Sequence, residues 1–306
     1  MSVPVDGLLV VDKPAGMTSH DVVARCRRVF GQRRVGHAGT LDPDATGVLL
    51  VGLGRATRLL RWLTGLPKRY TGEVVLGVAT STLDSSGEVT GRWDMARVTL
   101  EEARVAAASL TGEIDQVPPM VSALKVGGRR LHQLAREGIE VERAPRRVTV
   151  ERFELSLPPG RSADPHGGGP VLALDVTCSS GTYVRSLAAD LGEQLGGGAH
   201  LRALRRTAVG PFTDADAVGL DRVGPAHLRP PAACLPGMTT VVADSEVGEA
   251  VTHGRVLDAA ALAGSGPGPW AVLDRSGELL AVYEDHGPGR AKPATVLAGG
   301  EPGGGR

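Results

Sequence analysis

The chain has 306 residues, of which 42% are hydrophobic, and its 34 basic and 34 acidic side chains give zero net charge. This length can hold two domains with a real core. No apolar run approaches the roughly 20 residues of a membrane span, and the first residues lack the charged-then-apolar pattern of a signal peptide. We therefore expect a globular cytoplasmic protein without a membrane-embedded part.

Cysteine and histidine usage argues against disulfide and metal chemistry. Cys26, Cys178 and Cys234 are far apart in the sequence and form no CxxC pair, and the eight histidines include no HExxH motif. Such spacing suggests neither a disulfide framework nor a zinc site. We expect no metal and no other cofactor.

Charge is distributed unevenly along the chain. Residues 1–206 carry 27 Lys and Arg against 22 Asp and Glu, whereas residues 207–306 carry 7 against 12. A basic surface attracts polyanions such as nucleic acids. The first two-thirds of the chain is therefore the better candidate for binding one.

The N-terminal part is typical of a strand, a turn and a helix. Residues 7–11 form an apolar run, and Lys13 begins a turn rich in proline and glycine. Apolar residues then recur at helical spacing over 22–30, with capping residues at 18–19 and a glycine at position 31. These signals predict a helix with one buried face that ends at the glycine.

The densest set of unusual residues lies in the segment 36–57, GHAGTLDPDATGVLLVGLGRAT. Its apolar run from Val48 to Val51 predicts one buried strand. Asp42 before Pro43 favours a turn, in which the carboxylate either braces its own backbone or faces outward for chemistry. Asp44 follows closely, and we expect it to point to solvent.

A short amphipathic helix and a strand come next. The helix runs from Ala56 to Leu63, and the strand begins at Lys68 and Arg69. Tyr70 is one of only three tyrosines in the chain. A tyrosine at a strand start is often structural, so its pattern alone leaves its role open.

The middle of the chain holds a capped helix and then a segment, 117–142, that is expected to extend away from the sheet as an excursion. Thr99 and Glu102 form a capping box for a helix through Leu110. Residues 117–142 read as an extended piece, a Gly-Gly hairpin at 127–128 and a short basic helix. This excursion is either a solvated basic loop or a part that contacts the substrate.

Two strands are predicted at 147–157 and 171–178, and the second of them turns sharply into a helix. The turn is at Gly181, and the first helical turn carries Tyr183 and Arg185. Junctions of this kind place N–H groups and first-turn side chains in clefts. The segment 198–212 could be the last strand of the same sheet.

The C-terminal part begins after a proline-rich stretch near residue 225. We expect a linker at 226–238 and a small domain at 239–306, with strands at 270–274, 279–283 and 295–297. The glycine-rich end, 299–306, is expected to be disordered.

Five motifs in this order resemble those of the TruB-type tRNA pseudouridine synthases. They read DKPAGMTSHDVV, GHAGTLDPDATGVL, KRY, GTYVRSL and GAHLRALRRTAVGPF. The resemblance implies an α+β pseudouridine-synthase fold, with a central mixed, mostly antiparallel sheet flanked by helices. It also implies a catalytic domain over 1–225 with a thumb-like insertion at about 117–145, and a small β-rich C-terminal domain similar to PUA domains.

The resemblance further implies roles for individual residues. Asp42 would be the catalytic nucleophile, Arg185 its partner, and Tyr70 the residue that packs on the target base and takes a proton in the final step. Arg185 would hold the carboxylate ionised. The expected substrate-binding residues are His37, as a plug for the vacated base position, Tyr183, Leu204, Lys13, Arg205 and Arg206, the last two as phosphate contacts.

The activity implied is isomerisation of uridine 55 in the T loop of tRNA to pseudouridine, after the base is flipped out of its stack. The partner would be the T arm of tRNA, bound by a monomer without a guide RNA. The sequence leaves open whether the nucleophile attacks the ribose, attacks the base or acts through a glycal.

Two other functions compete with this interpretation. A non-catalytic RNA-binding or RNA-folding protein could keep the same scaffold, although binding alone does not require Asp42, Tyr70 and Arg185 together. Glycoside hydrolysis by Asp42 and Asp44 needs two carboxyl groups about 5–9.5 Å apart across a sugar. Neighbours in one turn rarely face each other in this way.

Overall fold

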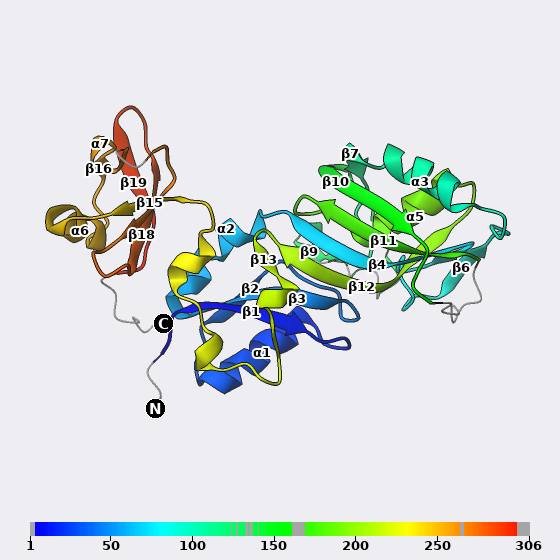
Figure 1. The fold of residues 1–306 in the computed structure, drawn as a ribbon, viewed down its shortest axis with the longest axis horizontal. Helices are drawn as coiled ribbons and strands as arrows, with labels where there is room; N and C mark the ends of the chain where they lie inside the picture. Colours follow the sequence, from blue (N-terminus) through cyan, green and yellow to red (C-terminus); the bar gives the residue numbers. More distant parts are fainter. Residues whose placement is uncertain are drawn as a thin grey trace.

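The computed structural model describes residues 4–122, 124–126, 128–131, 134, 137–139, 141–160, 169–263 and 266–298. The molecule is elongated, with a large sheet in its middle and a smaller sheet at one end (Figure 1). In the part of the chain that is described, no helix has both the length and the apolar character to cross a membrane.

The large sheet has ten strands, and most of its neighbours are antiparallel. The strands are β1 (Gly7–Lys13), β2 (Val35–Ala38), β3 (Thr46–Leu53), β4 (Lys68–Leu76), β7 (Gly112–Gln116), β10 (Arg146–Ser156), β11 (Val171–Cys178), β12 (Ala199–Val209), β13 (Phe212–Thr213) and β14 (Val218–Gly219). The main order is β14-β1-β3-β12-β4-β11-β10-β7, while β2 pairs with β3 and β13 pairs with β12. Among the described strands of this large sheet, the parallel pairs are β1–β14 and β3–β12. The expected α+β fold with a mixed, mostly antiparallel sheet is confirmed.

Local signals place the helices as expected, with one difference. Thr18 and Asp21 form a capping box at the start of α1 (Ser19–Phe30), and Gly31 ends it in the left-handed conformation at φ 62°. Thr99 caps α3 (Leu100–Ser109) in the same way. The helix expected from Ala56 begins instead as a 3-10 turn, η1 (Gly54–Leu59), before α2 (Leu60–Thr64).

The two halves of the sheet carry separate cores. Apolar residues of α3 and of α5 (Val184–Gln194) pack with those of β4, β10, β11 and β12. The buried face of α1 packs on β1 and β3. Because β12 lies between β3 and β4, the two halves meet along this strand. The segment expected as a last strand is thus central.

A five-stranded sheet forms the C-terminal β domain. Its elements are β15 (Thr239–Val242), α6 (Ser245–Thr252), β16 (Leu257–Asp258), α7 (Ala260–Ala263), β17 (Trp270–Leu273), β18 (Leu279–Asp285) and β19 (Arg290–Val296). The last three strands include the expected ones, with β19 starting five residues earlier than the sequence suggested. Arg55 and Arg58 of η1 donate to the carbonyls of Leu297 and Val296 at 2.6 and 2.9 Å. These bonds attach the small domain to the large one.

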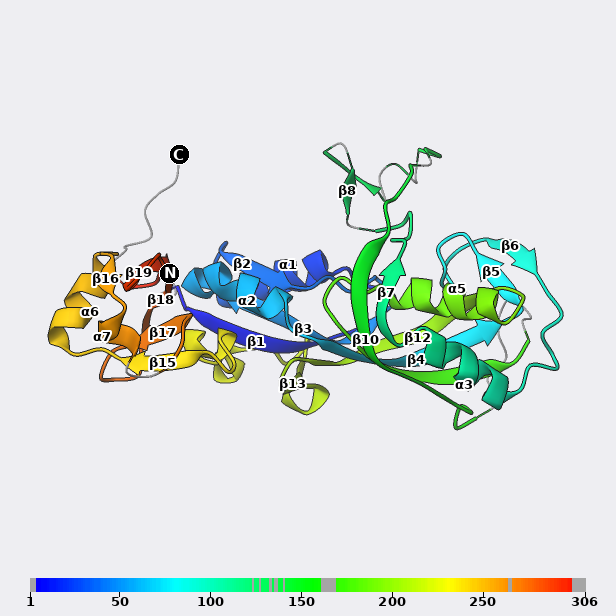
Figure 2. The same ribbon diagram turned by 90° about the horizontal axis from the view of Figure 1, so that it is seen from above.

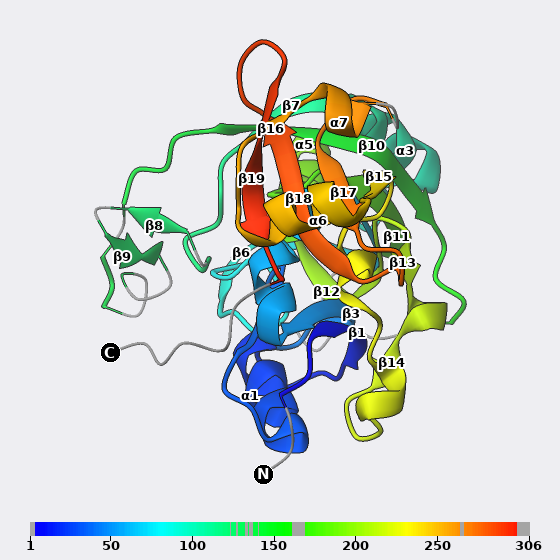
Figure 3. The same ribbon diagram turned by 90° about the vertical axis from the view of Figure 1, so that its left-hand side faces the viewer.

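Two hairpins extend from the large sheet. One is β5 (Val78–Thr80) with β6 (Val89–Arg92). The other, β8 (Lys125–Val126) with β9 (Arg129–Arg130), is the expected hairpin, and it stands away from the sheet within the insertion (Figure 2). Figure 3, along the long axis, shows that this hairpin projects on one side only. Most of the basic helix expected after it, and the C-terminal 299–306, lie outside the described residues.

Candidate active site

The loop that carries Asp42 connects β2 to β3. Its backbone is folded tightly, since the N–H of Ala45 donates to the carbonyl of Asp42 at 3.2 Å. Gly47, at φ 101°, ends the loop, and a Cβ there would lie 2.2 Å from the backbone oxygen of Arg206 on the neighbouring strand β12. Only glycine fits this crossing. The loop therefore has one defined path above the sheet.

Lys13 holds this loop from below. Its side chain is fully buried, and its ammonium donates to the carbonyls of Pro14 at 2.9 Å, Met17 at 2.6 Å and Pro43 at 2.8 Å. Burial lowers the pKa of Lys13 to about 8, and the nearby carboxylates of Asp44 and Asp42 oppose the shift. All three ammonium donors have acceptors, so the lysine stabilises the backbone around Asp42.

Arg206 holds the other end of the loop. It is 1% exposed, and its guanidinium donates to the carbonyls of Val48 at 2.7 Å, Gly39 at 3.0 Å and Thr40 at 3.4 Å. A buried guanidinium is stable only when its donors have partners. Lys13 and Arg206 together fix the loop from two sides.

The carboxylate of Asp42 is paired with Arg185, in the first turn of α5. The Nε of Arg185 lies 2.9 Å from Oδ2 of Asp42, and its Nη2 donates to Oδ1 at 3.1 Å. Two parallel contacts of this kind fix the plane of a carboxylate. The Arg185 side chain is 5% exposed and that of Asp42 is 42% exposed. The cation of the pair is therefore buried, whereas the carboxylate is partly accessible to solvent.

Further acceptors surround Arg185. Its Nη1 donates to the carbonyl of Thr82 at 2.9 Å, its Nη2 to that of Val121 at 2.8 Å, and its Nε lies 3.6 Å from Oδ2 of Asp84. Asp84 is itself held by the N–H of Ser86 at 3.1 Å. The guanidinium therefore joins the Asp42 loop, the Asp84 turn and the base of the insertion.

Burial raises the pKa of Asp42 above its ordinary value. The Arg185 guanidinium opposes this effect, whereas the Asp84 carboxylate adds to it. Arg185 therefore limits the upward shift that desolvation alone would cause.

A cavity of about 420 Å³ opens beside the pair. Asp42, Arg185, Tyr70, Tyr183 and Leu204 all line it. Tyr70 is 7% exposed, and burial raises the pKa of its phenol while the neighbouring Arg206 guanidinium opposes the rise. Such a volume suits a planar ring.

A second cavity, of about 460 Å³, is also lined by this pair. It shares Asp42, Arg185 and Leu204 with the first and adds residues of the Asp84 turn. Leu204 lies in an irregular part of β12, where the register shifts and Ala203 has φ 53°. Asp42 thus lines both cavities.

Comparison with known proteins identifies the family to which this chain belongs. Residues 27–184 match the N-terminal domain of the TruB family of pseudouridylate synthases, and residues 185–230 match the C-terminal domain of tRNA pseudouridylate synthase B. The chain belongs to the TruB family. It is thus a pseudouridine synthase, an isomerase.

Relatives of this TruB-family chain cover almost its whole length. A tRNA pseudouridine synthase B of Mycobacterium sp. (strain KMS) is 48% identical over 295 residues, which are 95% of this chain and 96% of the relative. That of Symbiobacterium thermophilum is 50% identical over 253 residues, 82% of each chain. A solved Cbf5-Nop10-Gar1 complex contains a chain with 26% identity and a TM-score of 0.68, covering 96% of this chain and 84% of the other.

The geometry gathers some of the expected residues of this TruB-family chain and separates others. Asp42, Tyr70, Arg185, Tyr183, Leu204 and Arg206 line one cavity. The phosphate contact expected for Arg206 is not supported, because its side chain is buried and donates to the loop carbonyls. The fully buried Lys13 likewise donates to backbone carbonyls and supports the loop, and its expected role in binding substrate stays a prediction.

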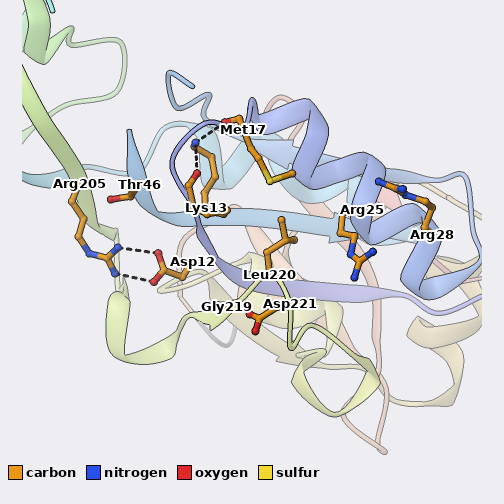
Figure 4. A pocket seen from close by; sticks show the side chains of 11 residues that line it. Asp12, Lys13, Met17, Arg25, Arg28, Thr46, Arg205, Gly219, Leu220 and Asp221 are labelled. Atoms are coloured by element: carbon orange, nitrogen blue, oxygen red, sulfur yellow. Dashed lines mark hydrogen bonds and ion pairs between the residues drawn. The ribbon is translucent and has the colours of Figure 1, made fainter. Parts of the chain in front are cut away.

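Three expected residues, Lys13, Arg205 and His37, lie outside the cavity that holds Asp42 and Tyr70. Arg205 forms a two-point pair with Asp12, at 2.9 and 3.1 Å, on the side of the sheet shown in Figure 4. His37 belongs to β2, and its ring makes an edge contact with that of His20, with centroids 5.3 Å apart. Its expected role as a plug stays a prediction.

Sequence reasoning did not single out Gln116, which the fold makes a positioning residue. Its amide donates to the carbonyl of Tyr183 at 3.1 Å and accepts from the N–H of Tyr183 at 2.7 Å. This reciprocal pair fixes the residue just before α5. Lys68, the first residue of the KRY motif, lines the cavity and donates to the carbonyls of Thr64 and Leu66 at 3.0 and 2.7 Å, but the sequence gave no role for it. Neither role could be inferred from the sequence, because the partners are main-chain atoms.

Proposed function

We propose that this chain converts uridine 55 in the T loop of tRNA to pseudouridine, with Asp42 as the nucleophile. The single observation that carries the proposal is the two-point contact between Asp42 and the buried Arg185, at the mouth of a cavity that Tyr70 also lines. An ionised carboxylate held in a fixed direction beside a hollow is what nucleophilic catalysis requires.

The reaction breaks the bond between N1 of uracil and C1′ of ribose and forms a bond between C5 and C1′. The proton leaves C5, and N1 gains one, so the change is redox-neutral and no cofactor is consumed. The chain must therefore activate the nucleotide, keep the detached base in place and move a proton. Asp42 serves the first need, and the cavity serves the second.

The target base must leave its stack to reach Asp42. Flipping a base costs a few kcal/mol, and stacking on an aromatic ring contributes roughly 1–3 kcal/mol per base. Tyr70 offers a ring inside the cavity, and Leu204 offers an apolar wall. These contacts offset much of the cost of flipping. His37 takes the vacated position in the loop under this proposal.

Tyr70 is the group that we propose to take the C5 proton. Burial favours the neutral phenol, whereas the Arg206 guanidinium favours the phenolate. The phenolate is the form that accepts the C5 proton in this proposal, and it becomes the neutral phenol when it does so. Tyr183, whose side chain interacts with Ser122, closes the same cavity.

The proposed partner is the T arm of tRNA, bound in the cytoplasm by a monomer without a guide RNA or cofactor. The hairpin formed by β8 and β9 serves as a thumb on the side of the sheet from which it projects. A glycoside hydrolase that uses Asp42 with Asp44 receives no support, since Asp44 is exposed while Asp42 is tied to Arg185.

The test uses a tRNA transcript labelled with tritium at C5 of uridine. We expect tritium release with a product of unchanged mass that carbodiimide labels at position 55, and none from a transcript with cytidine 55. Binding of tRNA without any pseudouridine would instead support a non-catalytic RNA-binding protein. Release of free uracil would support hydrolysis.

A further inference from the structure

A separate hollow of about 570 Å³ lies between α1 and the loop that follows β14 (Figure 4). It adjoins the nucleophile loop, because Thr46 and the buried Lys13 line it and Lys13 donates to the carbonyl of Pro43. It shares no lining residue with the two cavities beside Asp42. Apart from Lys13, which supports the Asp42 loop, the function proposed above assigns no task to the residues that line this hollow.

Two arginines on one side of α1 supply its free charge. Arg25 and Arg28 are three residues apart, so they are neighbours on the helix surface, and both are exposed. Neither forms a hydrogen bond or an ion pair with any residue in the described ranges. Figure 4 shows Arg25 extending from the helix toward the loop with Leu220 and Asp221. Two guanidinium groups thus face one hollow with their donors unused.

The other charges in the hollow are already paired, with one exception. Arg205 and Asp12 neutralise each other through two hydrogen bonds, and Lys13 donates only to carbonyls. Asp221, exposed at the rim, is the one further acid that lines the hollow. Arg25 and Arg28 therefore leave a positive balance. An anion with hydrogen-bond acceptors is the ligand that such a balance favours.

We propose that this hollow binds a phosphodiester segment of the substrate tRNA, apart from the cavity that receives the target base. The proposal rests on the function proposed above, since it assumes that the polyanion is the RNA whose base reaches Asp42. Arg25 and Arg28 bind phosphate oxygens, while Met17 and Leu220 provide an apolar surface for the sugar. A strand lying across the Pro43 turn would occupy both sites at once.

The first test measures binding of full-length tRNA at several salt concentrations. It compares the wild type with a double variant that carries both Arg25→Gln and Arg28→Gln. Each phosphate contact contributes roughly 0.7–0.9 to the slope of log K against log salt. We expect the slope to fall by about 1.5 and the Kd at 0.1 M salt to rise roughly tenfold. Pseudouridine formation at tRNA concentrations below KM should slow by about the same factor as the Kd rises. An unchanged slope and Kd would overturn the proposal.

Two further variants guard against nonspecific effects. Arg97→Gln removes an exposed arginine near α3, away from the hollow, and should leave the slope unchanged. Asp221→Asn removes the acid at the rim and should tighten tRNA binding, the opposite of a folding defect. Weaker binding by Asp221→Asn would contradict a phosphate in the hollow. Absence of pseudouridine with the wild type would refute the proposed function, whereas these binding measurements would still decide the hollow.

Discussion

The ammonium of Lys13 donates to the carbonyl of Pro43, the residue directly after Asp42, at 2.8 Å. Lys13 also donates to two carbonyls of its own turn, so one buried cation joins the first strand to the nucleophile loop. Removing it leaves three carbonyls without their donor.

Lys13→Met should therefore lower both stability and activity. A buried acceptor left without a partner costs about 1–3 kcal/mol, which urea unfolding would detect. A nucleophile displaced by about 1 Å can cost roughly 100-fold in rate, so kcat in a tritium-release assay should fall by about that factor. A variant as stable and as active as the wild type would show that the lysine does not hold the loop.

Arg185→Gln should change the pH dependence of the reaction. In the proposed mechanism Asp42 reacts as the anion, so the rate falls as pH drops through its pKa, which burial raises and Arg185 restrains. Without the guanidinium the pKa of Asp42 rises further, and the acid limb of the kcat profile moves to higher pH. At pH 7 the rate should fall by at least about 100-fold.

The control for Arg185 is an exposed pair of the same kind. Arg147 lies 3.1 Å from Asp115, and both side chains are more than half exposed. Such pairs contribute about 0–1 kcal/mol to stability, so Arg147→Gln should keep the wild-type pH profile. An unshifted acid limb in Arg185→Gln would mean that the contact with Asp42 does not control its ionisation.

Gly47→Ala should disrupt the crossing of β3 and β12. The new Cβ would lie 2.2 Å from the Arg206 carbonyl oxygen, at a φ of 101° that side chains rarely adopt. We expect a loss of more than about 3 kcal/mol in the free energy of unfolding, or failure to fold. Gly65→Ala is the matched control, because no atom lies within 4 Å of its Cβ and its φ is −76°. That variant should be as stable as the wild type.

Much of the fold is predictable from local sequence signals. The capping boxes at Thr18 and Thr99 and the apolar run within β3 define their elements without help from distant residues. The position of β12 between β3 and β4 is a different matter, because strand order depends on pairing between segments far apart in sequence. The segment gave no local sign that it lies in the middle of the sheet.

The site also contains residues that the sequence predicts and residues whose tasks it does not predict. The motifs placed Asp42, Tyr70 and Arg185 in one group, and these residues line one cavity. The tasks of Lys13 and Arg206 were not predictable, since their partners are backbone carbonyls that the chain brings together only on folding. The motif suggested phosphate binding for Arg206, whereas its buried guanidinium binds backbone carbonyls of the loop.

The lowered pKa of His37 predicts that the protein loses stability in acid. Burial lowers its pKa to about 4, so between that value and the ordinary 6.5 the unfolded chain binds a proton that the folded chain does not. Stability is therefore lost as pH falls through this window, by roughly 1–3 kcal/mol in all. His37→Gln should lose less stability over the same range in urea unfolding, whereas the exposed His286→Gln should follow the wild type. Parallel curves for His37→Gln and the wild type would contradict this account.

The most direct test of the proposed chemistry is tritium release from tRNA by Asp42→Asn, with Asp44→Asn as the matched control. The amide keeps the shape of the side chain but cannot act as an anionic nucleophile, so we expect Asp42→Asn to bind tRNA and form no pseudouridine. Asp44, which is exposed, should be replaceable with a change of less than about threefold. Pseudouridine formed at the wild-type rate by Asp42→Asn would contradict the assignment of the nucleophile.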